Sequence, residues 1–388
     1  MNINEAARIL DLKVDELRPF AETDPFNNVE VRGYISRRQD HRYGAMVIYY
    51  ADGNVDAQVI YGTPKFHYPF DKNGMFHFPA VERVEVHEKI DGTNILGFTY
   101  WTRPKGKSTP LVSYKTRLMP FVGDRGMGNF LTMWKRVLEK YPAAPFLVHS
   151  VGDWYDGAVS FEMFGSLNKH LLLYDVPLDA RLLFKVDSKG IYPPREFDWS
   201  RTVPTAQKVA SLGSTHDLYG FYRKHQAELG ALLEETDEGF KGAEGYMWYA
   251  LRSDDRLWEV FKCKPEQIQA IHFAAGGLNK ASIVSACYRV LESEDLTVEA
   301  VSQMLLEDWG QEHIDLALDT GKLRRVVEEI QQAQAFKDTC LTAARELWDT
   351  GLSLKEDKGT FMRALSAKLS PTEMRKAYAV IASTEETR

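Results

Sequence analysis

Lys89 is an unexpected residue for its position, because the apolar run around it favours a side chain that packs in a core. It comes at the end of a Val-rich run, residues 81–90 (VERVEVHEKI), and Asp91-Gly92 follow directly. A lysine is a costly residue where a strand runs toward a core. Once its charge is suppressed, however, a lysine amine can attack phosphorus or carbonyl carbon. Lys89 is therefore a candidate nucleophile, and an exposed lysine at a strand end is the simpler alternative.

Two glutamates lie among large apolar residues in segments that are expected to form strands. Glu162 belongs to SFEMFG (160–165), and Glu244 belongs to AEGYMW (243–248). A carboxylate in such surroundings needs a partner, for instance a ribose hydroxyl, a hydrated metal ion or a cation. Both are candidate ligands for a nucleotide or a metal. An outward-facing glutamate on a strand is the alternative for each.

Three further lysines could hold anions. Lys262 and Lys264 lie in FKCK (261–264), and residues two apart in a strand face the same side. Two neighbouring ammonium groups repel each other unless an anion such as a phosphate lies between them. Lys115, in YKTR (114–117), is a third basic group that could reach phosphates. A solvated strand face is the alternative reading in both places.

Together these segments resemble, in order and spacing, the motifs of ATP-dependent RNA ligases, members of the covalent nucleotidyltransferase superfamily. The segments that resemble motifs I, III, IV and V are EKIDGTN (88–94), SFEMFG (160–165), AEGYMW (243–248) and FKCKP (261–265). Lys115 resembles the motif Ia lysine, and Leu183-Phe184 resemble motif IIIa, where an apolar side chain flanks adenine. The resemblance covers about residues 30–270.

Within the superfamily the pattern is mixed. Asn94 occupies a position where DNA ligases and capping enzymes usually have arginine, and it resembles RNA ligases related to the second phage T4 enzyme. Two other segments, FEMFGSLNKHLLLY (161–174) and GTPKFHYP (62–69), are similar to the first phage T4 enzyme, as is a helical C-terminal domain. The second segment would make Lys65 a triphosphate contact. An upstream arginine is also implied, and Arg32 and Arg42 are both candidates.

The resemblance implies three steps. Lys89 forms lysyl–AMP from ATP, AMP passes to the 5′-phosphate of an RNA, and a 3′-hydroxyl then displaces AMP. The implied catalytic residues are Lys89, Asp91, Lys115 and Glu244. The implied nucleotide contacts, besides Lys89, are Lys65, Glu88, Asn94, Glu162, Phe184, Lys262 and Lys264. Glu162 and Glu244 would be ligands of Mg²⁺, for which Mn²⁺ could substitute. Lys262, Lys264 and the metal would disfavour a further positive charge on Lys89.

The expected fold class is α+β, a nucleotidyltransferase (ATP-grasp-like ligase) core of packed antiparallel sheets with flanking helices, followed by an all-α C-terminal domain. Short β-branched and aromatic runs predict strands up to about residue 275, with a hairpin turn at Asp52-Gly53 and helices at 129–141 and 215–235. The predicted strands include 169–176 and 180–187.

Beyond residue 275 the pattern becomes helical. Apolar stripes predict helices at 296–310, 321–351 and 358–369, and Ser370-Pro371-Thr372-Glu373 is typical of a helix start. We therefore expect an adenylyltransferase domain at 1–275 and a helical domain at 276–388. The second domain could recognise RNA, with Lys322, Arg324 and Arg325 as candidate contacts and a solvated helix face as the alternative.

Composition narrows the classes of protein. The net charge is −7, and residues 281–388 carry six of these negative charges, which argues against a protein that coats nucleic acid nonspecifically. Three widely spaced cysteines, the absence of an 18-residue apolar run and a polar N-terminus favour a cytoplasmic protein. We expect a monomer, although no feature of the sequence sets the oligomeric state. The resemblance also allows a phage-encoded enzyme acting in the host cytoplasm.

Three other functions stay open. A DNA ligase or another polynucleotide adenylyltransferase of the capping type would share most motifs. A nucleic-acid-binding protein without catalysis would not need the intact set of lysines and glutamates. An enzyme that adenylylates a protein or a small molecule would share the first step. The leading expectation remains a ligase that joins 5′-phosphate and 3′-hydroxyl ends of RNA.

Overall fold

The computed structural model divides the chain into two compact units. It describes residues 1–71, 74–125, 128–155, 157–168, 170, 172–194, 203–213, 215–236, 239–251, 259–265, 278, 280–291, 295–306, 309 and 311–385. The first unit comprises Met1–Val122 and Arg136–Gly276, and the second comprises Gly123–Lys135 and Gly277–Arg388. Among the described residues, no helix is both long enough and apolar enough to span a membrane.

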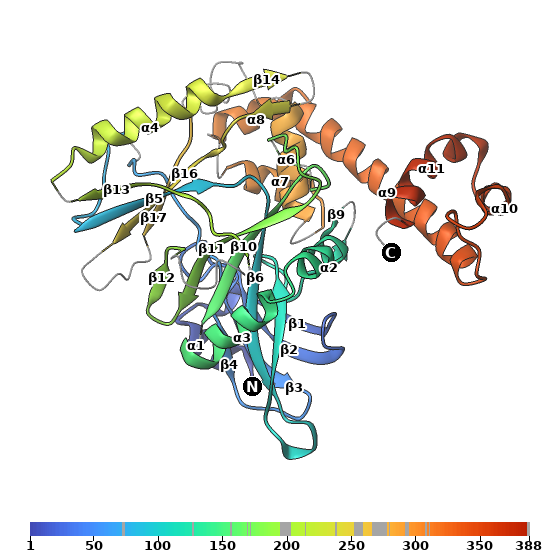
Figure 1. The fold of residues 1–388 in the computed structure, drawn as a ribbon, viewed down its shortest axis with the longest axis horizontal. Helices are drawn as coiled ribbons and strands as arrows, with labels where there is room; N and C mark the ends of the chain where they lie inside the picture. Colours follow the sequence, from blue (N-terminus) through green and yellow to red (C-terminus); the bar gives the residue numbers. More distant parts are fainter. Residues whose placement is uncertain are drawn as a thin grey trace. The chain divides into compact units, whose positions relative to one another are not determined.

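Three antiparallel sheets form the first unit (Figure 1). One has the order β1-β2-β3-β4, with strands Leu17–Asp24, Val29–Ser36, Met46–Ala51 and Gln58–Ile60. The second has the order β12-β11-β10-β6-β7, with strands Gly190–Tyr192, Asp179–Asp187, Ala158–Phe164, Thr93–Thr102 and Thr109–Lys115. The third has the order β13-β5-β16-β17, with strands Lys208–Gly213, Arg83–Lys89, Gly245–Leu251 and Val260–Cys263.

A shared apolar core lies among these sheets. Phe20 and Val31 come from the first sheet, Phe98 and Phe184 from the second, and Tyr249 from the third. Burial of such side chains stabilises the fold by about 1.5–3 kcal/mol each. The alternation of inward and outward residues along each strand, which the sequence shows as period-2 runs, is what lets three sheets share one core. The strand ends are left free to carry polar residues.

Helices cover the outer faces of the sheets. Helix α4 (Leu218–Leu232) lies along the third sheet (Figure 1). Its Tyr222 and Leu229 belong to one apolar cluster with Val86 and Trp248 of that sheet. Helix α1 (Ile3–Leu10) packs on β1 and β3. The remaining helices and short strands of this part of the chain are η1 (Val14–Glu16), η2 (Pro104–Gly106), α2 (Phe130–Lys140), α3 (Ala144–Tyr155), β8 (Asp124–Arg125), β9 (Gly128–Asn129), β14 (Glu234–Thr236) and β15 (Gly239–Lys241).

The described residues from 280 onward that adopt regular structure are all helical. Their helices are α6 (Lys280–Leu291), α7 (Val298–Leu305), α8 (Gln311–Asp319), α9 (Lys322–Trp348), α10 (Lys358–Leu365) and α11 (Pro371–Glu385). The long helix α9 contributes to two separate apolar clusters, one near Val327 and one near Leu347. Ser370 Oγ accepts the Glu373 N–H at 3.3 Å, and Glu373 Oε2 accepts the Ser370 N–H at 2.7 Å. The predicted start of the last helix is therefore confirmed.

The predicted α+β class, with antiparallel sheets and flanking helices, is confirmed, and Asp52-Gly53 does turn the chain, with φ of 35° and 79°. The strand predicted at 169–176 is wrong for the described residues, where only an isolated bridge joins Leu172 to Phe240. In the described part of this segment, the Leu172 N–H binds the Asp91 side chain and only the Leu173 N–H binds a strand, at the Phe240 carbonyl of β15, so that no ladder of backbone hydrogen bonds forms there. Strand β13 and helix α3 lie outside the predicted elements.

Candidate active site

Lys89 and Glu244 meet because two strand ends are paired. Strand β5 ends at Lys89, β16 begins at Gly245, and these two residues are directly opposite each other in the antiparallel register. Glu244 is therefore the residue that enters the sheet beside the lysine. Lys89 Nζ donates a hydrogen bond to Glu244 Oε2 and forms an ion pair with it. The Lys89 side chain remains 21% exposed, which leaves it accessible to a substrate.

Lys264 holds the other oxygen of the same carboxylate. It follows the end of β17, and its Nζ lies 3.2 Å from Glu244 Oε1. The Glu244 side chain is only 6% exposed, and a carboxylate buried to this degree needs cationic partners. Burial acts to raise the pKa of Glu244, but Lys89 and Lys264 outweigh it and hold the pKa below its ordinary value. The ionised carboxylate thus bridges two amines.

Asp91 is buried next to this triad. Its Oδ2 accepts the Leu172 N–H at 2.7 Å, and its own N–H donates to the Tyr174 hydroxyl at 2.9 Å. Burial, reinforced by the negative charge of Glu244, raises the pKa of Asp91. A carboxylate with a raised pKa is better suited to accept a proton near neutral pH than an ordinary one. The structure therefore brings a candidate base close to the candidate nucleophile.

Asn94 and Glu162 form a second polar group on neighbouring strands. They face each other across β6 and β10, and Asn94 Nδ2 lies 3.4 Å from Glu162 Oε2. The Asn94 amide also donates to Ser160 Oγ at 2.8 Å, and its Oδ1 accepts from Thr63 Oγ1 at 2.7 Å. These partners fix the amide orientation, so that its N–H side faces Glu162.

Gly92 joins the two groups. A Cβ at this position would lie 3.1 Å from Glu162 Cγ and much closer than 3.0 Å to the Met163 carbonyl oxygen. The absence of a side chain at Gly92 thus lets the turn after Lys89 lie against β10. The close approach that the structure demonstrates is to the backbone of β10.

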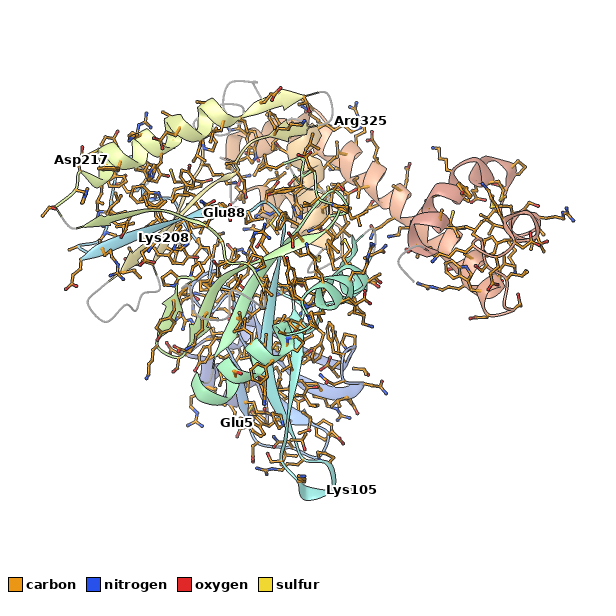
Figure 2. The ribbon with its side chains drawn as sticks, viewed as in Figure 1. Glu5, Glu88, Lys105, Lys208, Asp217 and Arg325 are labelled. Atoms are coloured by element: carbon orange, nitrogen blue, oxygen red, sulfur yellow. The ribbon has the colours of Figure 1, made fainter. Side chains whose placement is uncertain are left out.

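Four predicted nucleotide contacts have partners within the protein. Lys262 and Lys264 were expected to share one anion, but Lys262 Nζ lies 4.8 Å from the centre of the Tyr68 ring while Lys264 binds Glu244. Lys65 Nζ donates to Gln39 Oε1 at 2.6 Å. Glu88, which Figure 2 labels on β5, exchanges two hydrogen bonds of 2.8 Å with the Gln207 backbone.

Two predicted residues are fully buried. Lys115 is 0% exposed, and its Nζ donates to the carbonyls of Gly44, Thr116 and Arg117 at 2.8–3.0 Å. Burial, with smaller contributions from nearby arginines, lowers the pKa of Lys115 to about 7. Phe184 is 1% exposed and packs edge-on against Phe66 in the core. The partners described for Lys115 and Phe184 are therefore residues other than Lys89 and Glu244.

The two upstream arginines bind carboxylates within the first unit. Arg32 Nη2 lies 2.7 Å from Glu30 Oε1, and its guanidinium lies over the Tyr50 ring. Arg42 Nη2 lies 2.6 Å from Asp40 Oδ2, and Nη1 donates to the Asp11 carbonyl. Neither geometry selects one of them as a triphosphate contact.

Sequence reasoning missed His170, Tyr174 and Thr63, which contact Asp91, Thr93 or Asn94. They come from segments 31 to 83 positions away from their partners. Thr63 and Tyr174 do lie in segments whose resemblance to RNA ligases was noted, GTPKFHYP and FEMFGSLNKHLLLY. That resemblance was the available signal, although it did not identify these particular side chains.

The carboxylates of the site suit a hydrated cation better than a fully ligated one. In the described part of the chain, no group of three His, Cys, Asp or Glu side chains is arranged to hold a metal ion. Mg²⁺ keeps several waters and often takes only one or two carboxylates. Glu162, whose Oε2 lies 3.4 Å from Asn94 Nδ2, could be one such carboxylate, and Glu244 already pairs with two amines.

Comparisons with solved structures find ligases. An archaeal ATP-dependent RNA ligase matches with a TM-score of 0.44 and 13% identity, over 80% of this chain and 74% of its own. A protein from Aquifex aeolicus, named as an ATP-dependent DNA ligase, has a TM-score of 0.39 and 10% identity, over 86% and 78%. A Naegleria gruberi RNA ligase variant with ATP and Mn has a TM-score of 0.33 and 10% identity, over 66% and 98%.

Neither the protein-family models nor the curated proteins contain a match to this chain. The structural similarities are too weak to assign a function, which has to rest on the residues of the site.

Proposed function

We propose that the chain is an ATP-dependent RNA ligase that joins 5′-phosphate and 3′-hydroxyl ends through a lysyl–AMP intermediate. The observation that carries the proposal is the bridge of Glu244 between Lys89 and Lys264, at the paired ends of three strands. This arrangement places the partly exposed amine of Lys89, which is paired with Glu244, near the second cation, Lys264. The motif resemblance supplies the reaction, and this geometry supports the choice of nucleophile.

In the first step, Lys89 Nζ attacks the α-phosphorus of ATP. The ammonium group of Lys89 first loses one proton to solvent. A nitrogen–phosphorus bond then forms, the bond to pyrophosphate breaks, and a second proton passes to solvent, so that one N–H remains in the phosphoramidate. Lys89 must leave Glu244 in order to attack, and a buried carboxylate without a partner is costly. Lys264 remains 3.2 Å from Glu244 Oε1 and keeps that carboxylate paired. We therefore propose that Lys264 stays paired with Glu244 throughout this step, while its other N–H groups donate to phosphate oxygens of the bound ATP.

A divalent cation would neutralise negative charge on the phosphates as the bond to pyrophosphate breaks. Glu162 would hold it, through its waters, and Asn94 would orient the Glu162 carboxylate. Glu244 would be a second ligand only after one of its amines has moved away.

In the later steps, AMP passes to the 5′-phosphate of an RNA strand, and the 3′-hydroxyl of another end attacks the activated phosphorus. The 3′-oxygen forms a bond to phosphorus, the bond to AMP breaks, and the hydroxyl proton passes to Asp91. The raised pKa of Asp91 supports this role as proton acceptor. Lys115 has no part in the proposed mechanism because its three donors bind carbonyl groups inside the protein.

The test is formation of the covalent intermediate. The protein is incubated with ATP or GTP labelled at the α-phosphate, with Mg²⁺, and analysed on a denaturing gel. We expect a protein–AMP adduct from ATP alone. Lys89→Arg, which keeps the charge but removes the nucleophile, should abolish it, whereas Lys115→Met should retain it. Absence of any adduct in the unaltered protein would contradict the proposed mechanism.

The second part of the test identifies the polymer. Isolated lysyl–AMP protein is mixed with 5′-phosphorylated RNA or DNA, and transfer of AMP and joining of ends are followed separately. We expect joined RNA. Joining of DNA alone would replace RNA by DNA as the substrate. Adduct formation without transfer to either polymer would favour adenylylation of a protein or a small molecule.

A further inference from the structure

A loop after β10 encloses the Asp91 carboxyl group. The backbone N–H of Leu172 donates to Asp91 Oδ2 at 2.7 Å, and the Tyr174 hydroxyl accepts the Asp91 N–H at 2.9 Å. His170 Nδ1 lies 4.0 Å from the other carboxylate oxygen, Oδ1. The side chains of His170 and Asp91 are 5% and 13% exposed. One short segment therefore donates to one carboxylate oxygen of Asp91, accepts its backbone N–H, and places the His170 ring near the other oxygen.

The other ring nitrogen of His170 belongs to a chain of polar groups. His170 Nε2 lies 3.2 Å from Thr93 Oγ1, and Asn168 Nδ2 lies 3.1 Å from that same hydroxyl oxygen. Asn168 Nδ2 also donates to the Met163 carbonyl at 2.7 Å. Because a carbonyl only accepts hydrogen bonds, the amide nitrogen of Asn168 must face Met163.

These contacts select a tautomer of His170. Asn168 donates to Thr93, the Thr93 hydroxyl donates to His170 Nε2, and the imidazole proton is left on Nδ1, facing Asp91. In the opposite arrangement, Thr93 would donate to Asn168 Oδ1 at 3.2 Å. The lone pair of Nδ1 would then face a carboxylate, which is repulsive. The separation of 4.0 Å between His170 Nδ1 and Asp91 Oδ1 is too long for a normal hydrogen bond. It still lies within the range at which an N–H dipole attracts a negative charge.

We propose that His170, protonated on Nδ1, is a positioning residue. It orients Asp91 to accept the proton of the 3′-hydroxyl as that hydroxyl attacks the activated phosphorus. This inference rests on the proposed function and adds a residue to it. The described contacts of His170 lead to Thr93 and Asp91, whereas Lys89 is held by Glu244. Loss of His170 should therefore affect the sealing step much more than formation of lysyl–AMP.

The experiment separates these two steps in one protein. RNA already adenylylated at its 5′ end is offered with a 3′-hydroxyl acceptor, so that joining needs no ATP. Lysyl–AMP formation from labelled ATP is measured in parallel and also reports on folding. We expect His170→Leu to slow joining about tenfold or more, the effect of losing one interaction with a charged group, and to change lysyl–AMP formation by less than about threefold. His170→Asn, which can place an N–H near Asp91, should recover most of the joining rate.

Each outcome decides between the alternatives. An equal loss in both steps for His170→Leu, or no recovery in His170→Asn, would mean that His170 is merely structural. Failure of the unaltered protein to join adenylylated RNA would instead overturn the proposed function, and this inference with it.

A second pair of variants covers the possibility that His170→Leu fails to fold. Thr93→Val removes the hydroxyl that sets the tautomer, and Thr93→Ser retains it. We expect slow joining only in Thr93→Val. Selective ¹⁵N-histidine labelling, with the signal assigned by its loss in His170→Asn, should show the proton on Nδ1 in the unaltered protein. A proton on Nε2 would contradict the proposal.

Discussion

Two buried lysines of this protein are stabilised in different ways. Lys264 lies beside a carboxylate, Glu244, so its positive charge is balanced within the site. Lys115 has three carbonyl partners, and the nearest charges that influence it belong to Arg117 and Arg18. Carbonyl groups can accept hydrogen bonds from an amine, but they do not compensate a full positive charge. The first lysine therefore suits chemistry with anions, and the second joins backbone segments.

The stability of the protein should depend on the protonation of Lys115. Its pKa is about 7 in the folded protein, against 10.5 as its ordinary value, so between these limits the unfolded chain binds more protons. The free energy of unfolding should therefore rise with pH in this window, by up to about 1.4 kcal/mol per pH unit. Urea unfolding of the protein and of Lys115→Met, at pH 7, 8 and 9, measures the difference.

The control is Lys107→Met, at an exposed lysine. We expect the unfolding free energy of the unaltered protein, minus that of Lys115→Met, to increase with pH. The same difference taken with Lys107→Met should stay constant. Parallel pH profiles for all three proteins would refute the lowered pKa.

The site is built from the ends of strands, where side chains are no longer used by the core. Lys89 ends β5, Gly245 begins β16, and Thr93 begins β6 directly after the turn at Gly92. The register of β5 with β16 brings Glu244 to Lys89, and the register of β6 with β10 brings Asn94 to Glu162. Close contact between the turn and β10 is thus a condition for assembling both polar groups.

A side chain at position 92 should disturb this contact. In Gly92→Ala, the added Cβ would clash with the Met163 carbonyl, which belongs to the backbone of β10 and cannot turn away. We expect a loss of about 1–3 kcal/mol in the free energy of unfolding, as for other overpacked sites, and slower lysyl–AMP formation. Urea unfolding and the adduct assay measure both effects.

Gly123→Ala is the matched control, because a Cβ there would meet no atom within 4 Å and the backbone does not have positive φ. Its unfolding free energy should change by about 0.5 kcal/mol or less. Equal effects of the two substitutions would show that the contact of Gly92 with β10 is not what constrains this position.

At the scale of the whole molecule, each unit has apolar clusters of its own, and the described site residues belong to the first unit. The second unit is acidic overall but begins its longest helix with three exposed cations, Lys322, Arg324 and Arg325. Figure 2 labels Arg325 on this helix. Cations at a helix N-terminus are unfavourable for the helix dipole. Helix stability therefore does not explain this basic cluster, which supports the proposal that it contacts RNA.

Replacing these three residues by alanine should weaken RNA binding and leave lysyl–AMP formation unchanged. Each contact with a phosphate of single-stranded nucleic acid contributes roughly 0.7 to the slope of log binding constant against log salt concentration, so the slope should fall by about 2. Binding of 5′-phosphorylated RNA at several salt concentrations measures it.

The control triple variant, Lys355→Ala, Arg363→Ala and Lys376→Ala, removes the same charge from other exposed positions of the second unit. If both triple variants change the slope equally, the salt dependence of RNA binding comes from the net charge of the protein and not from the basic cluster.

Local sequence by itself determined the elements and the candidate chemistry. Period-2 runs predict strands that end at Lys89 and pass through Glu162, and apolar stripes predict the C-terminal helices, because these patterns depend on neighbours only a few residues apart. Motif order and spacing then indicated Lys89, Glu244 and Lys264 as parts of one site.

Only the tertiary structure decided which of these groups touch. Lys89 meets Glu244 across 155 positions of sequence, and Asp91 meets Leu172 across 81. Such contacts depend on which non-adjacent strands pair and in which register, and local patterns do not specify either. For the same reason the sequence could not show that Lys115 and Phe184 are buried, or that His170 lies beside Asp91.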